Sequence, residues 1–356
     1  MFETLELGDI TARQASVGLA LALGLAFGLL GERTGFCFRR AVIGADRRAA
    51  LGVWAAALGV AVLGTQLAVA RGWIGFDAHR FMASDLPILA IALGGLAFGA
   101  GMVLTRGCLS RLAVLSGTGN LRALIVLGVF AVVAHATLKG VLAPLRTQLG
   151  AVTVDLGALT SLAALPGGAG LWSGVIAVAA AGLVWRAGAG VWPLLGGAAI
   201  GLLVPLGWVG TGYVLYDDFD PIAMQSLSFT APAADSLFFV VASSAIPAGF
   251  GVGLVGGVLI GALISAWLTG RFRWQSFESP RQTGRYLAGA GLMGVGGVLA
   301  GGCTVGAGLS GTASLSVAAF LALAAIALGA LLTNAVIRSA SAPAGSSTRP
   351  ALQPAE

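Results

Sequence analysis

The sequence predicts an all-α, polytopic membrane protein, because its composition leaves too little charge for a soluble exterior. Apolar residues make up 57% of the 356-residue chain, charged residues only 10%, and the mean hydropathy is +0.94. A soluble protein of this length needs a much more charged surface. Uncharged runs such as residues 49–70 and 250–270 are long enough to cross a hydrocarbon core of about 30 Å as helices.

Nine spans are expected, at about residues 15–32, 49–70, 86–105, 121–143, 171–187, 191–209, 250–270, 285–300 and 314–337. The acidic residues Glu3, Glu6 and Asp9 before the first span are the opposite of the basic start of a cleavable signal. We divide the chain into a four-span half (1–150), a linker with one connecting span (151–190) and a second four-span half (191–338). The tail at 339–356 is rich in Ala, Ser and Pro and is expected to be disordered.

The distribution of basic residues predicts which side of the membrane each connecting segment faces. With the N-terminus periplasmic and the C-terminus cytoplasmic, fifteen of the 20 Lys and Arg residues fall on the cytoplasmic side, as the positive-inside rule requires. In a membrane protein the net charge of +6 mainly indicates orientation, and no nucleic-acid partner is expected. The 4+1+4 arrangement makes the second half inverted relative to the first, and inverted repeats place substrate sites near the midplane.

The three cysteines of the chain share one local frame, in which a glycine precedes each by nine residues. The word GLAFG ends at two of these glycines, and AGLMG is a degraded third copy. A weaker fourth copy, GAAIG, has Gly210 where the others have cysteine. The alternative is chance recurrence in a chain with 56 glycines. The frames are Gly28 to Cys37, Gly99 to Cys108, Gly294 to Cys303 and Gly201 to Gly210.

Each cysteine lies just beyond a span, in a short glycine-rich segment: residues 34–40 (TGFCFRR), 105–111 (TRGCLSR) and 301–311 (GGCTVGAGLSG). Irregular backbone survives at membrane depth only beside protein or a water-filled cavity. We therefore predict re-entrant loops, two from one face and one from the other. Residues 226–232 and 236–247, which are apolar, short and bounded by proline, are expected to form the corresponding element of the quarter that lacks a cysteine.

Thiols suit a soft, sulfur-bearing solute better than a hard oxyanion or alkali cation. Arg106 and Arg111 flank Cys108 and are candidates to hold an anion, although arginines at the interface commonly serve topology alone. His135 lies within the fourth span and has two interpretations, helix packing or proton handling. The chain lacks a C-x-x-C and has only two histidines, so no metal or other cofactor is expected.

These residues resemble the YeeE/YedE family of bacterial inner-membrane sulfur-compound transporters over about residues 15–337. The most specific segment, GGCTVGAGLSG, fits the family pattern C-x-x-G-x-G-x-S-G as Cys303, Gly306, Gly308, Ser310 and Gly311. The resemblance implies uptake of thiosulfate, passed along the three thiols by transient hydrogen bonds with Cys108 at the centre. It also implies a separate TusA-like sulfur-carrier protein as a partner.

Two other functions remain open from the residues. One is a membrane thiol enzyme, a sulfurtransferase or disulfide-exchange protein; the other is transport of a selenium species or another sulfur anion such as sulfite. We favour transport over an enzyme because no motif for thiol exchange or metal binding accompanies the cysteines. The chain has no Walker motif, so ATP hydrolysis by this chain is not expected. The sequence leaves the coupling ion and the oligomeric state undetermined.

Overall fold

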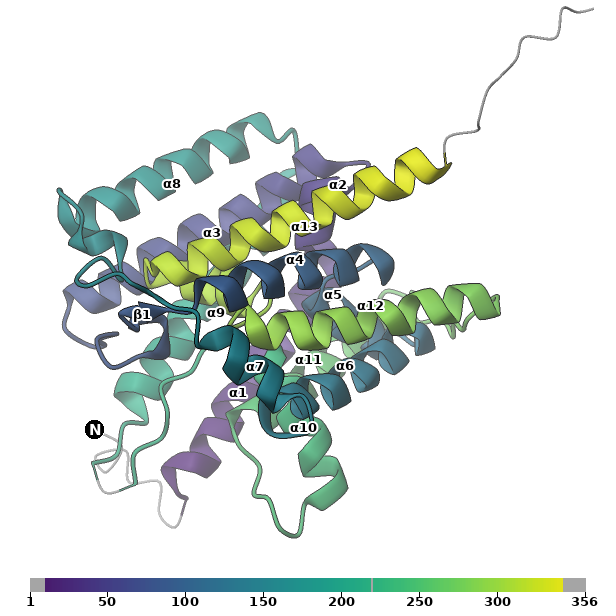
Figure 1. Ribbon diagram of the computed structural model, residues 1–356, viewed down its shortest axis with the longest axis horizontal. Coiled ribbons are helices and arrows are strands. Elements are labelled where there is room, and N and C mark those ends of the chain that lie inside the picture. The colour runs from purple at the N-terminus through teal and green to yellow at the C-terminus, as the bar shows by residue number, and fades with distance from the viewer. Residues whose placement is uncertain (1–9, 219, 342–356) are drawn as a thin grey trace, which may run out of the picture.

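The computed structural model describes residues 10–218 and 220–341 and is a bundle of helices with almost no sheet (Figure 1). The first half contains α1 (Ala12–Thr34), α2 (Phe38–Ile43), α3 (Arg47–Ala70), α4 (Ile88–Leu104), α5 (Leu109–Gly117) and α6 (Leu121–Lys139). After α7 (Ala143–Gly150) and α8 (Gly168–Arg186) come α9 (Val191–Val209), α10 (Thr230–Ala242), α11 (Phe250–Leu268), α12 (Pro280–Leu299) and α13 (Val317–Ser341). The predicted all-α, polytopic class is confirmed.

Each of the nine expected spans has a corresponding long helix in the described residues, but the helices differ in hydropathy. Eight helical stretches there are long and apolar enough to cross a membrane. The exception is α12, whose first turns carry Arg281 and Arg285. This helix packs against α4 and α6, so contact with protein compensates for its lower hydropathy.

Short elements connect the long helices at both ends of the bundle. The turns η2 (Arg80–Met82) and η3 (Leu162–Ala164) lie beside a two-stranded sheet of β1 (Asp85–Leu86) and β2 (Val154–Asp155), which pair antiparallel with Asp85 opposite Asp155. Two π-helical turns, η4 (Gly210–Val214) and η5 (Gly306–Gly311), follow α9 and precede α13. Helix α10 stands where the sequence predicts a short element of the third quarter.

The glycines of the repeated frames lie at helix crossings, where a Cβ atom would collide with the neighbouring backbone or side chain. The frame glycines of α1 face α11, those of α9 face α3, those of α4 face α13, and that of α12 faces α6. At these crossings α1, α3, α4 and α6 each meet one of α9, α11, α12 and α13. Close approach of helix backbones through small residues is a general way of packing helices in membranes. The residues concerned are Gly24, Gly28, Gly95, Gly99, Gly197, Gly201 and Gly294.

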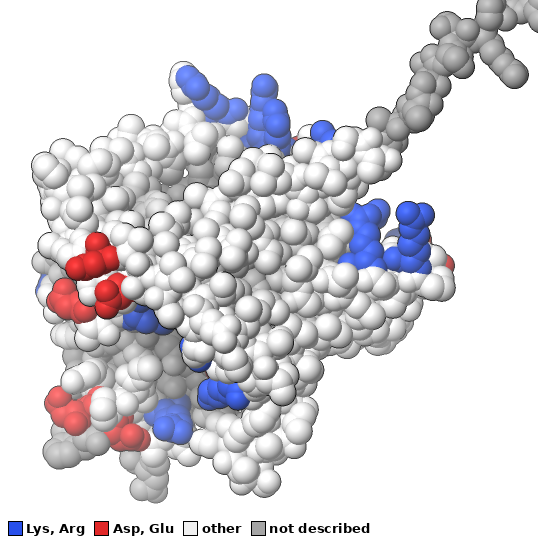
Figure 2. Space-filling model, viewed as in Figure 1, with Lys and Arg blue, Asp and Glu red and all other residues white. Residues whose placement is uncertain are grey.

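Charged side chains gather at the ends of the long helices. Figure 2 shows acidic side chains on the side of the molecule where β1 lies and groups of basic side chains at the opposite end, where α12 begins. We call the latter the basic face. The C-terminal turns of α13 lie on this face, because Arg338 and the α2–α3 turn line one hollow.

Three expectations about boundaries change. The chain does not break at Gly210, which has ordinary right-handed helical angles and continues α9 into η4. The fourth span ends at Lys139, and the separate helix α7 begins at Ala143 with Pro144 in its first turn. Residues 339–341, expected as part of the tail, belong to α13; the rest of the expected tail, residues 342–356, lies outside the described chain.

Candidate functional site

The three cysteines follow the same backbone turn. A residue in the left-handed conformation stands two positions before each of them: Gly35 (φ 63°), Arg106 (φ 60°) and Gly301 (φ 75°). Glycine adopts this conformation without strain, whereas another residue does so at a cost of about 1–2 kcal/mol. The turn ends one helix and lets the chain re-enter the protein, so Cys37 and Cys108 become the N-cap residues of the short helices α2 and α5.

Cys37 and Cys108 lie in contact. Their sulfur atoms are 3.4 Å apart, and the Cys108 sulfur is also 3.4 Å from the Ser110 hydroxyl. Both thiols are buried and neither forms a disulfide. Two thiols and a hydroxyl at one point provide donors that can turn toward a sulfur atom without any covalent change.

Cys303 lies apart from this pair, at the start of η5, and is fully buried. The Gly306 N–H donates to its sulfur at 3.4 Å, and the Ser310 hydroxyl donates to the Leu227 carbonyl at 2.6 Å. A Cβ on Gly306 would lie 2.5 Å from the Ser228 hydroxyl. The segment before α10 therefore lies directly against the Cys303 loop.

An aromatic cluster connects the two cysteine sites. Phe36 precedes Cys37, and Phe229 lies next to the Cys303 sulfur. The Phe27 ring contacts both, with centroid distances of 6.1 Å to Phe36 and 5.2 Å to Phe229. All three rings are buried. They place an apolar, tightly packed group of rings next to both cysteine sites.

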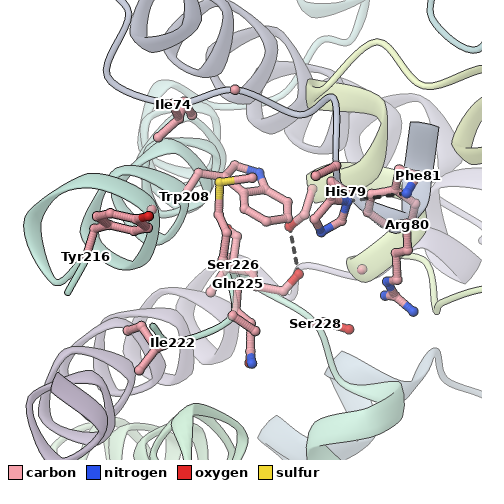
Figure 3. A pocket seen from close by; sticks show the side chains of 18 of the residues that line it. Ile74, His79, Arg80, Phe81, Trp208, Tyr216, Ile222, Gln225, Ser226 and Ser228 are labelled. Carbon is pink, nitrogen blue, oxygen red and sulfur yellow. Dashed lines mark hydrogen bonds between the residues drawn. The ribbon is translucent and has the colours of Figure 1, made fainter. Parts of the chain in front are cut away.

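A cavity of about 700 Å³ opens on the side of the bundle away from the basic face and reaches the Cys303 loop at Gly306 and Ser310. Figure 3 shows His79 and Trp208 on one side of it and the segment carrying Gln225, Ser226 and Ser228 on the other. The loop between α3 and α4 and the segment between α9 and α10 supply most of its walls. We call this cavity the vestibule.

Arg80 and His79 are vestibule residues that the sequence did not single out. Arg80 lies within electrostatic range of the Cys303 sulfur, and its guanidinium lies 5.0 Å from the Phe81 ring centroid. Burial, with the neighbouring Arg80, lowers the pKa of His79 to about 4, so His79 is neutral at pH 7. The one sequence signal for these two residues is the aromatic-rich run WIGFDAHRF at residues 73–81, which lies between two expected spans.

Two buried polar groups near the vestibule lack a hydrogen-bond partner among the described residues. They are Trp208 Nε1 and the Thr304 hydroxyl. Trp208 lines the vestibule, while Thr304 follows Cys303 in the chain. A buried polar group without a partner costs about 1–3 kcal/mol, and such groups mark a place for a bound polar solute.

The remaining predicted residues have mixed positions. Arg111 lies beside the cysteine pair and donates to the Gly31 carbonyl at 3.0 Å, whereas Arg106 is exposed at the turn before Cys108. Gly308 and Gly311 line no cavity described above; a Cβ there would meet Leu323 and Ala319 of α13. His135 stacks on Phe238 with a centroid distance of 4.0 Å, an arrangement typical of helix packing.

The described residues contain no group of three or more His, Cys, Asp or Glu side chains placed to hold a metal ion.

Comparison with known proteins identifies the family of the chain. No curated protein matches the chain. The family described as Sulphur transport matches residues 33–332, a stretch that holds all three cysteines and both walls of the vestibule. The chain belongs to this sulphur-transport family, the YeeE/YedE family.

Proposed function

We propose that this protein takes up thiosulfate, or a closely related sulfur anion, across the bacterial inner membrane. The observation that carries the proposal is the Cys37–Cys108 pair, whose sulfur atoms lie 3.4 Å apart, buried and without a disulfide, in a chain whose vestibule reaches Gly306, the residue whose N–H donates to a third thiol. Thiosulfate has a soft terminal sulfur and three hard oxygens, so thiols and arginines together match both of its ends.

The first step is capture in the vestibule. Arg80 attracts the dianion, while Trp208 Nε1 and the Thr304 hydroxyl, which have no partner in the described structure, donate to its oxygens. The Cys303 thiol then donates S–H to the terminal sulfur. In this proposal Arg80 acts on the oxygens and Cys303 on the terminal sulfur of the same anion, and their electrostatic interaction supports that pairing.

The second step is passage from Cys303 to the Cys37–Cys108 pair. The Phe27, Phe36 and Phe229 rings lie between the two sites and have to turn aside for the anion to pass. Cys108 then receives the terminal sulfur and, with Cys37 and Ser110 within 3.4 Å, replaces the donors lost at Cys303. The thiols keep their protons and no covalent bond forms.

The orientation proposed from the sequence puts the vestibule on the periplasmic side and the basic face in the cytoplasm. The distribution of charge in Figure 2 supports it. The reciprocal glycine crossings of the two sets of helices support two inverted halves. We further propose that a separate TusA-like carrier receives sulfur at the cytoplasmic face.

Uptake of labelled thiosulfate into proteoliposomes that contain only this protein tests the proposal. Wild-type protein is expected to accumulate or exchange label, with and without an imposed proton gradient as parallel arms. Excess unlabelled sulfite, sulfate and selenite distinguish thiosulfate from related anions. Absence of any protein-dependent flux would refute the transport function.

The close thiol pair also favours a second candidate, a sulfurtransferase. In that reaction the Cys108 thiolate attacks the terminal sulfur of thiosulfate, the S–S bond of thiosulfate breaks, and sulfite leaves with the bonding electron pair. The product is a persulfide on Cys108. Mass spectrometry of protein incubated with thiosulfate checks this candidate: a gain of one sulfur atom on Cys108 with release of sulfite supports it, and unmodified Cys108 during active transport excludes it.

A further inference from the structure

Five arginines on the cytoplasmic side of the proposed layout have a partner that neutralises the guanidinium or accepts a hydrogen bond from it. Pairing with a carboxylate or an oxygen acceptor is the usual state of a partly buried guanidinium. Such partners are Asp46 for Arg40, Glu32 for Arg271, Glu278 for Arg122, the Gly31 carbonyl for Arg111 and the Ser265 hydroxyl for Arg33.

Arg39 and Arg285 differ from this group. Their Nε atoms are buried and have no hydrogen-bond partner in the part of the chain that the structure describes. Arg39 lies in α2, two residues after Cys37, and Arg285 lies near the start of α12. A buried donor of a charged group that lacks an acceptor is costly, so each position favours a bound anion.

The packing of α4 against α12 brings Arg106 to the same place as Arg285. A Cβ on Gly289 would lie 2.9 Å from the Gly101 carbonyl oxygen and 2.7 Å from Thr105 Cγ2. Arg285 precedes Gly289 by about one turn, and Arg106 follows Thr105 directly. Both arginines therefore lie at the same end of this helix crossing.

Arg39 completes the cluster. It interacts electrostatically with Arg106 and Arg285, and also with the Cys37 sulfur. Cys37 in turn contacts Cys108, two residues after Arg106. Three like charges from three elements repel one another, and Arg106 additionally holds a left-handed backbone conformation. An anion bound among them offsets the repulsion and accepts the unpaired N–H groups.

We propose that Arg39, Arg106 and Arg285 form a release site that binds a divalent sulfur oxyanion as it leaves the Cys37–Cys108 pair. This inference rests on the proposed transport function and gives that path its last binding site. The three guanidiniums are hard donors suited to the sulfonate oxygens, while the adjacent thiols suit the terminal sulfur. An anion held by both ends moves from the thiols to the arginines without ever losing all its donors.

Transport measured separately from the two faces tests the release site. A cleavable tag at the C-terminus reports orientation, since α13 ends at the basic face. Half-saturating thiosulfate concentrations are measured from each face of oriented proteoliposomes by counterflow. Arg285→Gln is expected to raise this concentration about tenfold from the basic face, the loss of roughly one charge-assisted hydrogen bond, and to change it less than twofold from the vestibule face.

Two matched variants complete the experiment. Arg281→Gln removes an exposed arginine one turn earlier on α12 and is expected to behave as wild type from both faces. Arg285→Lys keeps the charge and is expected to recover part of the affinity. Arg39→Gln is expected to show the same face-specific loss of affinity. Because Arg39 lies on α2, this result would show that the effect of Arg285→Gln is not caused by misfolding of α12.

The outcomes separate this inference from the transport proposal. Wild-type protein without flux defeats the transport function itself. Active wild type, with Arg285→Gln and Arg39→Gln unchanged from the basic face or equally impaired from both faces, overturns the release site while leaving transport intact.

Discussion

Replacement of Cys108 separates its role in transport from its role in packing. The Cys108 sulfur contacts the Cys37 sulfur and the Ser110 hydroxyl, each at 3.4 Å, and the residue is 1% exposed. Cys108→Ala removes one buried sulfur atom, for which a loss of about 1 kcal/mol in the free energy of unfolding is expected. The fold therefore survives the change, and any larger effect on transport reflects chemistry at the thiol.

The effect on transport follows from the donor that is lost. When the anion reaches the pair, Cys108→Ala leaves its terminal sulfur without one hydrogen bond to a charged group, worth about 1.5–3 kcal/mol. At about 1.36 kcal/mol per factor of ten, uptake is expected to fall by roughly 10- to 150-fold. Cys108→Ser keeps a donor of smaller radius and is expected to lie between the variant and wild type.

The assay is the initial rate of labelled thiosulfate uptake into proteoliposomes, normalised to the amount of folded protein after size-exclusion chromatography. Thermal unfolding of each variant in detergent supplies the stability control. Wild-type uptake by Cys108→Ala would refute the thiol relay, even if the family assignment and the transport function stand.

Four further predictions concern the vestibule, the thiol pair and the helix crossings. Arg80→Gln is expected to raise the half-saturating thiosulfate concentration from the vestibule face about tenfold while Arg71→Gln does not; equal affinities in saturation curves of the two would contradict a binding role for Arg80. A mild oxidant such as copper phenanthroline is expected to form a disulfide between Cys37 and Cys108, whose sulfur atoms lie 3.4 Å apart, and to leave Cys303 unpaired. If peptide mapping finds Cys303 in the disulfide instead, the described arrangement of the thiols is not the one in solution. Gly99→Ala is expected to lower the thermal unfolding midpoint, because the new methyl group meets the backbone of α13 at a cost of about 1–3 kcal/mol. The control, Gly128→Ala, places a methyl group with no atom within 4 Å and is expected to be neutral or stabilising. Calorimetry that ranks the two midpoints in the reverse order would refute the packing role of Gly99. The folded protein holds the pKa of His79 at about 4, so the unfolded chain takes up a proton on His79 first as the pH falls below about 6.5. The free energy of unfolding is therefore expected to decrease from pH 7 toward pH 4. His79→Asn is expected to flatten that part of the plot of stability against pH, and an unchanged slope would argue against a neutral, buried His79.

The sequence predicted the helices well because the signals for them are local. Each expected span is a run of apolar residues, and the physical requirement to cross the bilayer acts on that run alone. The glycine frames were also visible, but their meaning was not. Gly28 and Gly99 were first noted as markers before a cysteine, and the structure shows that they allow helices of the two halves to touch.

The site was only partly predictable, because its contacts join residues far apart in the chain. Cys303 and Cys108 were identified from their matched frames, but the contact between Cys37 and Cys108 depends on how two re-entrant turns meet. Arg80 was not singled out, since nothing nearby in the sequence indicates that its loop lines the same cavity as the Cys303 loop. The partnerless Arg285 was hidden for the same reason: its importance comes from Arg39 on α2 and Arg106 after α4.

The helix crossings also determine how late in its synthesis this protein can complete its fold. Helix α1 packs against α11, whose first residue is made about 200 residues after α1 ends, or roughly 10–40 s later at 5–20 residues per second. Until then the small-residue face of α1 meets only lipid or an assisting protein. A ribosome that stops before residue 250 therefore leaves an inserted chain whose first helix can pack against α5 and α9 but lacks its most extensive partner, α11, and quality-control proteases are expected to remove it. The same geometry predicts that two halves made as separate chains accumulate only when both are present in one membrane.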